Sequence, residues 1–155
     1  MKSKNVQETE RILLDVLRYL TDILQNNISN ISVDYEYVHI ALRERIAMYG
    51  ISTKCKGYLY IKEAVLLTFK DSNRRVNFKK NVYPIIAGRH IPATAESVEH
   101  AIRNAIKAAY DKSRSESGKW ISEMSGLDSC PSNKRFILDL GEELRSSIHT
   151  ELLNY

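Results

Sequence analysis

The amino-acid sequence predicts an all-α protein of six or seven helices, and two observations carry this prediction. Apolar residues recur at intervals of three and four along most of the 155 residues, the spacing that places them on one face of a helix. No segment alternates between apolar and polar residues with the period of two that a half-buried strand requires. The sequence also contains no internal repeat and no low-complexity tract.

The first two predicted helices lie on either side of a polar stretch at residues 25–30. Residues 6–26 form an amphipathic helix whose apolar face consists of Leu13, Val16, Leu17, Leu20, Ile23 and Leu24. The polar stretch reads as a linker, and the second helix stops at Gly50, where glycine favours a helix end. We therefore divide the chain into residues 1–30, a helix with its linker, and residues 31–155, a helical domain.

The remaining helices follow from apolar periodicity and from capping residues. Residues 58–71 are apolar on much of their circumference, which predicts a central helix. A helix over residues 76–87 contains Pro84, which has no N–H and should kink or open it. Thr94 caps a long helix that ends near Lys112. A short helix around Trp120 (residues 115–125) and a last helix that begins at Pro131-Ser132-Asn133 complete the prediction.

Composition excludes several classes of protein. The longest purely apolar stretch is about a third of the length of a membrane span, and the charged N-terminus does not resemble a secretory signal. The two cysteines, Cys55 and Cys130, form neither a disulfide framework nor a zinc pattern. The balance of charged and aliphatic residues is that of a folded chain. We expect a cytoplasmic protein that does not bind a membrane.

The distribution of charge indicates a polyanionic partner. Residues 51–110 hold 11 Lys and Arg against 4 Asp and Glu, whereas both flanks are slightly acidic. Clustered cations meet a phosphate backbone cooperatively. Solvated helix faces are the plain alternative explanation of these charges.

Two predicted helices, residues 76–87 and 94–112, have the dimensions of a helix-turn-helix. On the second helix, one face is apolar and rich in alanine, which would let the helix sit close to its partner. The opposite face carries Glu96, Glu99, His100, Arg103 and Lys107. Arg can donate two hydrogen bonds to guanine and Glu can accept one from cytosine, so this face suits the reading of base edges.

Four sequence blocks resemble the C-terminal effector domain of the stage 0 sporulation protein A family. The blocks occur in the family's order and are KGYLYIKEAV (residues 56–65), VYPIIA (82–87), VEHAIRNAI (98–106) and Pro131-Ser132-Asn133 with Phe136-Ile137. Together they cover roughly residues 36–146. The resemblance implies a six-helix DNA-binding domain with a helix-turn-helix, used in spore-forming bacteria to regulate transcription at a short operator.

The resemblance also implies the residues that read bases. The family uses a Glu and two Arg on its recognition helix, which correspond here to Glu99, His100 and Arg103. A further Arg of the family corresponds to Ser97, and the turn around His90-Ile91-Pro92 holds one extra residue. The substitution of His for Arg should weaken or retarget one base position, because a bidentate Arg–guanine contact contributes ~1–3 kcal/mol of discrimination.

Further residues are candidates for contacts to the DNA backbone. Most are basic residues within or near the helix-turn-helix, and the full set is Lys56, Arg75, Lys79, Lys80, Arg89, Ser97, Lys107, Asn133 and Lys134. At Asn133 and Lys134 the N–H groups that open the last helix could hold a phosphate, and plain helix capping explains the same residues equally well. Lys54 and Arg74 carry the same kind of charge nearby.

The N-terminal helix departs from the family pattern. Full-length members carry an α/β receiver domain with a phosphorylated aspartate, and residues 1–35 are too few to hold one. We therefore expect no aspartyl-phosphate switch in this chain. Residues 6–26 approximate a heptad seam, which favours a helix for homodimerisation or for docking to another regulator. The alternative is that this helix packs back on its own domain.

No pattern of catalysis or of metal or cofactor binding is present. The four histidines do not have the paired spacing of metal ligands on one helix, and no glycine-rich phosphate loop occurs. The acidic residues are scattered and do not indicate a catalytic acid/base pair. We expect neither an enzyme nor a small-molecule substrate. The leading hypothesis is a sequence-specific regulator that binds double-stranded DNA. The alternatives are a protein-interaction module or antagonist that pairs with a full-length regulator, and a general nucleic-acid binder.

Overall fold

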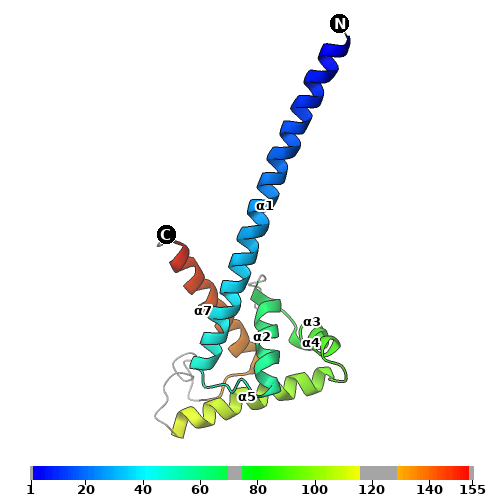
Figure 1. Cartoon of the computed structure of the whole chain (residues 1–155). Coiled ribbons are helices and arrows are strands. Elements are labelled where there is room, and N and C mark those ends of the chain that lie inside the picture. The colour runs from blue at the N-terminus through cyan, green and yellow to red at the C-terminus, as the bar shows by residue number, and fades with distance from the viewer. Residues whose placement is uncertain (1, 70–74, 116–128, 154–155) are drawn as a thin grey trace. The chain divides into compact units, whose positions relative to one another are not determined.

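The computed structural model describes the backbone of residues 2–69, 75–115 and 129–153. Every regular element in these ranges is a helix and none is a strand, which confirms the all-α prediction (Figure 1). The helices are α1 (Lys2–Met48), α2 (Lys56–Phe69), α3 (Phe78–Asn81), α4 (Tyr83–Arg89), α5 (Ala95–Ser115) and α7 (Asn133–Leu153). The predicted helix around Trp120 lies outside the described residues, apart from its first residue.

The chain forms two compact units, Met1–His39 and Ile40–Tyr155. Helix α1 contributes to both, because it runs without interruption through the boundary. The expected linker at residues 25–30 is therefore wrong, and the division falls after His39 instead of after residue 30. The stretch contains no Gly and no Pro, and Asn or Ser inside a helix costs only a few tenths of a kcal/mol per residue. The end of the helix is as predicted, since Gly50 takes a left-handed φ of 70°.

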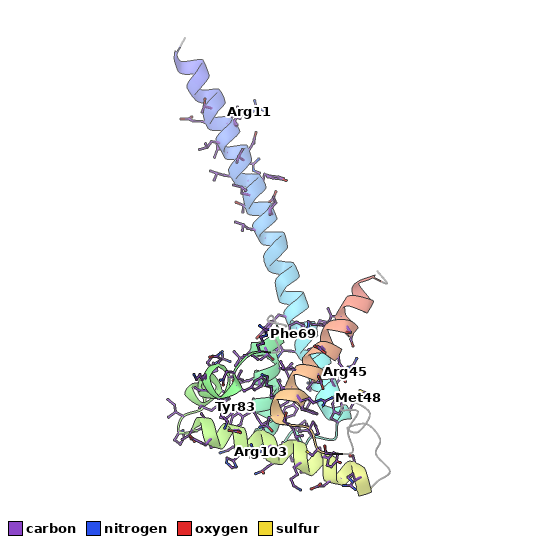
Figure 2. All side chains as sticks on the ribbon, turned by 180° about the vertical axis from the view of Figure 1, so that it is seen from behind. Arg11, Arg45, Met48, Phe69, Tyr83 and Arg103 are labelled. Carbon is purple, nitrogen blue, oxygen red and sulfur yellow. The ribbon has the colours of Figure 1, made fainter. Side chains whose placement is uncertain are left out.

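In the first unit, the side chains of residues 9–25 are all exposed. Nine of them are large and apolar, with exposed fractions between 38% and 66%. We call this set the apolar band; its members are Ile12, Leu13, Leu14, Val16, Leu17, Tyr19, Leu20, Ile23 and Leu24. Figure 2 shows side chains pointing outward from this part of α1, near the labelled Arg11. The predicted amphipathic helix is thus present, and its apolar face is uncovered in the single chain.

Helix α2 is the centre of the second unit, as its apolar sequence predicts. It packs against α5, α7 and α4. Its inward residues include Tyr60, Ile61, Ala64 and Val65, all at most 5% exposed. No helix among the described residues is both long enough and apolar enough to cross a membrane.

Small residues allow α2 to approach α5 closely. A Cβ atom added at Gly57 would lie 2.3 Å from the carbonyl oxygen of Ala101 and 2.6 Å from the Cβ of Ala105. No side chain larger than hydrogen fits at this position, so glycine is required by the close approach. The alanines of α5 therefore allow the close approach predicted for this helix, and the approach at Ala101 and Ala105 is to α2.

The segment predicted as one helix over residues 76–87 is divided into α3 and α4, which meet at Val82. Pro84 lies in the first turn of α4, where its missing N–H leaves no hydrogen bond unmade. The predicted opening of the helix at this proline is confirmed. Asn77 caps α3, because its side chain accepts a hydrogen bond from the backbone N–H of Lys80 at 3.2 Å.

The apolar faces of α5 and α7 complete the core. On α5, Val98, Ile102 and Ile106 are at most 1% exposed. On α7, the fully buried residues are Phe136, Ile137, Leu140 and Leu144. The Tyr49 hydroxyl donates a hydrogen bond of 2.6 Å to Glu143 of α7. Burial, reinforced by this carboxylate, raises the pKa of Tyr49 well above its ordinary value.

Candidate nucleic-acid interface

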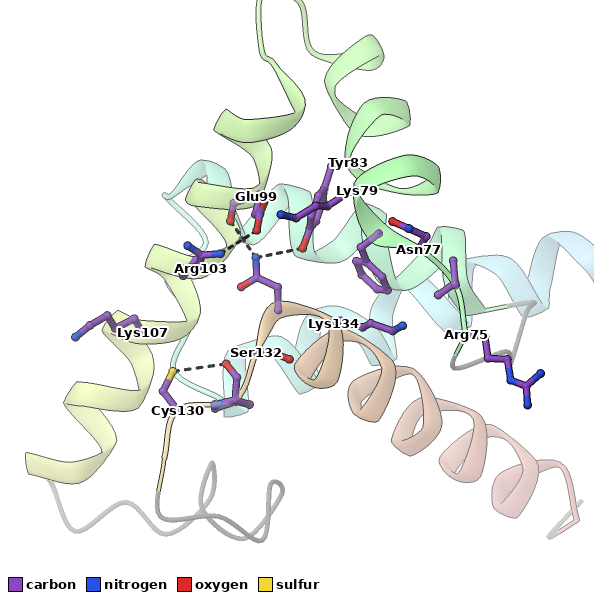
Figure 3. Close-up of a pocket in the computed structure, with 14 residues that line it drawn as sticks. Arg75, Asn77, Lys79, Tyr83, Glu99, Arg103, Lys107, Cys130, Ser132 and Lys134 are labelled. Carbon is purple, nitrogen blue, oxygen red and sulfur yellow. Dashed lines mark hydrogen bonds and ion pairs between the residues drawn. The ribbon is translucent and has the colours of Figure 1, made fainter.

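A groove of about 680 Å³ lies between the segment before α4, the outer side of α5 and the start of α7 (Figure 3). Arg75 and Lys79 approach it from the first segment, Arg103 and Lys107 from α5, and Lys134 from α7. Five basic side chains from three separate parts of the sequence therefore line one depression. Such a cluster produces a positive potential that attracts polyanions.

The exposed face of α5 presents the residues expected to read bases. Arg103 donates a hydrogen bond of 2.8 Å to the Glu99 carboxylate one turn earlier, as Figure 3 shows. The Arg103 side chain remains 57% exposed, whereas that of Glu99 is 20% exposed. His100 is also exposed. Helix α5 thus places the Arg103 guanidinium and the Glu99 carboxylate side by side at the wall of the groove. The hydrogen bond between them orients both side chains.

Asn133 connects α7 to this part of α5. Its side-chain amide donates a hydrogen bond of 3.0 Å to the backbone carbonyl of Glu99 and one of 3.3 Å to the hydroxyl of Tyr83. Asn133 is only 8% exposed, so its side chain acts within the protein instead of reaching toward a phosphate. Burial raises the pKa of the Tyr83 hydroxyl despite the hydrogen bond from Asn133, and the group stays neutral. The two hydrogen bonds of Asn133 hold α5 in place relative to α4 and α7. They do so at Glu99, a residue expected to read a base.

Lys107 lies one turn beyond Arg103, and its ammonium is 2.7 Å from the carboxylate of Asp111. The hydrogen bond to this carboxylate raises the pKa of Lys107, which stays charged. Burial raises the pKa of the neighbouring Cys130 thiol, which keeps it protonated. Lys107 therefore presents a charged ammonium that is paired with a carboxylate of its own helix.

Four of the predicted backbone-contact residues lie outside the groove lining. The Ser97 hydroxyl is engaged in capping α5, since it accepts a hydrogen bond of 2.9 Å from the backbone N–H of Thr94. Arg89 makes an ion pair of 3.4 Å with Glu63, which also contacts His90. Lys80 is exposed on α3, and Lys56 lines a second depression between α5 and the start of α2.

Sequence reasoning missed three residues that shape this region. Asn77 and Cys130 line the groove, and Glu63 holds both Arg89 and His90. Asn77 could have been found, because asparagine just before a helix is a preferred cap. Glu63 could not, since only the fold brings it to residues that lie 26 and 27 positions later.

The described residues contain no group of three His, Cys, Asp or Glu side chains placed to hold a metal ion. The chemistry that the groove does offer is hydrogen bonding and charge. A comparison with protein families gives an independent result: residues 42–144 match the family model described as sporulation initiation factor Spo0A C terminal. This range contains α2 to α5 and the start of α7, and with them every residue that lines the groove.

Proposed function

Because the chain belongs to the family of Spo0A C-terminal domains, which are DNA-binding domains of sporulation regulators, we propose that it is a sequence-specific regulator of transcription. Its ligand would be double-stranded DNA, with α5 placed in the major groove. Membership of the family supports the general activity, which is DNA binding. The observation that carries the finer proposal is the joint position of Glu99 and Arg103 on the exposed face of α5, at the wall of a basic groove.

The polar face of α5 supports a direct reading of base edges. When Arg103 meets guanine, its guanidinium can leave Glu99 and donate two hydrogen bonds to the base, while the Glu99 carboxylate can accept one from a neighbouring cytosine. The ion pair of the free protein keeps both side chains near these positions, which lowers the conformational entropy lost on binding. His100 has fewer hydrogen-bond donors than the Arg that the family has at this position. Its contact would therefore give this protein a different preference at one base position of the operator.

The basic residues around α5 support contacts to the DNA backbone. Arg75, Lys79 and Lys134 would meet phosphates on one side of the recognition helix, and Lys107 would meet them along the helix itself. Lys56, Lys80, Arg89 and Ser97 remain proposed flanking contacts. The backbone N–H groups of Asn133 and Lys134 remain proposed phosphate contacts, whereas the Asn133 side chain would act through the position of α5.

A titration by fluorescence anisotropy tests this function. The full chain is titrated with a duplex that contains the family's operator box and with a scrambled duplex, each at two salt concentrations. We expect a preference of about a thousandfold for the box, equivalent to ~4 kcal/mol. Equal affinity for both duplexes, together with binding that disappears as salt rises, would contradict sequence-specific recognition.

A second function is favoured by the apolar band on residues 12–24, which the single chain leaves exposed. We propose that residues 6–26 are an interaction segment, which pairs with another copy of this chain or with another regulator. Contiguous exposed apolar surfaces mark interaction sites in many proteins. An antagonist would form a tight complex through this segment and bind DNA weakly, which the same titration distinguishes from a regulator.

A further inference from the structure

The apolar band has a regular position in a seven-residue repeat. With Leu13 and Leu20 at the first position of the heptad, Val16 and Ile23 occupy the fourth. These are the a and d positions that meet at the centre of a coiled coil. All four residues are 38% to 62% exposed in the single chain, so a central seam of the right spacing is available for a partner.

Residues beside this seam are apolar as well. Leu17 and Leu24 fall at the e position, and Ile12 and Tyr19 fall at the g position. These four side chains are 52% to 66% exposed. A two-helix coiled coil buries mainly a and d and usually carries charged residues at e and g. Pairing of two copies would therefore leave half of these eight apolar side chains at the rim.

The charged residues of the same stretch lie on the opposite side of the helix. Asp15 and Asp22 occupy the c position, while Arg11 and Arg18 occupy the f position. From Ile12 to Leu24, no charged residue falls at a, d, e or g. The apolar side therefore spans four of the seven heptad positions, a breadth that one neighbouring helix cannot cover but two flanking helices can.

The identity of the central residues indicates how many helices associate. In parallel coiled coils, β-branched residues at a with leucine at d favour two helices, whereas leucine at a with isoleucine at d favours a larger number. This chain has leucine at both a positions and β-branched residues at both d positions. We propose that residues 6–26 of four copies of this chain form a parallel four-helix coiled coil. The proposal rests on the proposed interaction role of this segment and is independent of DNA binding.

The sequence that follows the band limits the bundle. The next a and d positions hold Asn27 and Asn30, and the a position after them holds Asp34. Polar residues at central positions specify register at a cost in stability, so the dry part of the bundle ends at Leu24.

The oligomeric mass of the full chain tests the proposal. Sedimentation equilibrium across a wide range of protein concentrations should approach four times the chain mass of 17.8 kDa. Leu20→Asp should reduce the mass to that of one chain, because it places a charge in a central layer. The matched control is Arg18→Ala at the outward f position, which should leave the mass unchanged. A wild-type mass of two or three chains overturns the four-copy arrangement, and a mass of one chain overturns the interaction role with it.

A second variant tests the parallel orientation and keeps the apolar composition constant. It exchanges the central residues through Leu13→Val, Val16→Leu, Leu20→Ile and Ile23→Leu. In a parallel bundle this places β-branched residues in the a layers, and the mass should fall twofold, to two chains. In an antiparallel bundle each layer contains both a and d residues, so the exchange leaves the layers unchanged. A variant that keeps the wild-type mass of four chains therefore overturns the parallel arrangement.

Discussion

Helix α5 and the N-terminal stretch of α1 are both amphipathic, yet their apolar faces have opposite fates. On α5, Ile102 is fully buried against the rest of its unit and Arg103 points outward. On α1, Leu13 and Leu20 are 62% and 48% exposed, although their spacing along the helix is just as regular. An amphipathic pattern therefore establishes that a helix has a face to bury, and it leaves open whether the partner lies in the same chain.

The difference between the two helices comes from their neighbours. Helix α5 meets α2 through Gly57 and the alanines of its own inner side, so that the backbones approach closely. The band on α1 consists of large side chains, which suit knobs-into-holes packing between long helices. Burial of an apolar face is thus achieved by small residues within the second unit, and in the proposed bundle it would be achieved by large residues between copies.

The largest expected effect comes from truncation of the two apolar faces. Ile102→Ala should lower the free energy of unfolding of the globular unit by ~2–5 kcal/mol, because it removes fully buried atoms and leaves a cavity. Leu13→Ala should change it by less than about 0.5 kcal/mol, because Leu13 belongs to the other compact unit and not to the core of this one. Urea unfolding followed by near-UV circular dichroism of the buried tyrosines measures both. Equal losses would mean that the exposed helix supports the globular unit.

The close approach between α2 and α5 should be sensitive to a single methyl group. Gly57→Ala should destabilise the protein by ~1–3 kcal/mol, because the added Cβ would collide with the backbone of Ala101. Gly88→Ala in α4 is the matched control, since a Cβ there meets nothing within 4 Å. The control should be neutral or stabilising by up to ~1 kcal/mol. Thermal unfolding of both variants is the measurement, and similar stabilities would contradict the tight contact.

The polar faces of the two helices should differ in DNA binding. Arg103→Ala should weaken binding to the preferred duplex by ~1–3 kcal/mol and flatten the preference among sequences. Arg18→Ala, on the polar side of the N-terminal helix, should leave that preference unchanged. The anisotropy titration described above reports both values. Retention of full preference by the Arg103 variant would exclude Arg103 from base recognition.

The contact between α7 and α5 should matter for specificity as well as for stability. Asn133→Ala removes the hydrogen bonds to the Glu99 carbonyl and to the Tyr83 hydroxyl and should cost ~1–2 kcal/mol of stability, because each such bond contributes about 1 kcal/mol. It should also reduce the preference for the operator box at temperatures where the variant is folded. Tyr83→Phe keeps the contact to Glu99 and serves as the comparison. An Asn133 variant with normal sequence preference would show that this residue acts on stability alone.

The smallest expected effect concerns single phosphate contacts. Lys79→Ala should weaken binding to preferred and scrambled duplexes alike, and it should reduce the slope of log affinity against log salt concentration by about one. The readout is the salt dependence of the anisotropy titration. A loss confined to the preferred duplex would instead indicate that Lys79 reads sequence.

The residues that could be placed from the sequence are those with local signals. The spacing of Val98, Ile102 and Ile106 predicted the inner face of α5, and Pro84 predicted the division between α3 and α4. The break expected at residues 25–30 was wrong, because asparagine and serine only weaken a helix. The tie between Asn133 and Glu99 could not be predicted, since it joins residues 34 positions apart.

Sequence alone determined the helical class, most helix ends, the apolar band and the family, because each depends on residues that are close in the chain or on ordered motifs. Tertiary structure decided which charges share a groove and which are held elsewhere. Lys79, Arg103 and Lys134 converge on one depression, whereas Arg89 pairs with Glu63 and Ser97 caps its own helix. The physical reason is that a hydrogen bond or an ion pair is satisfied by whichever partner the packing brings within reach, and packing is a property of the whole chain.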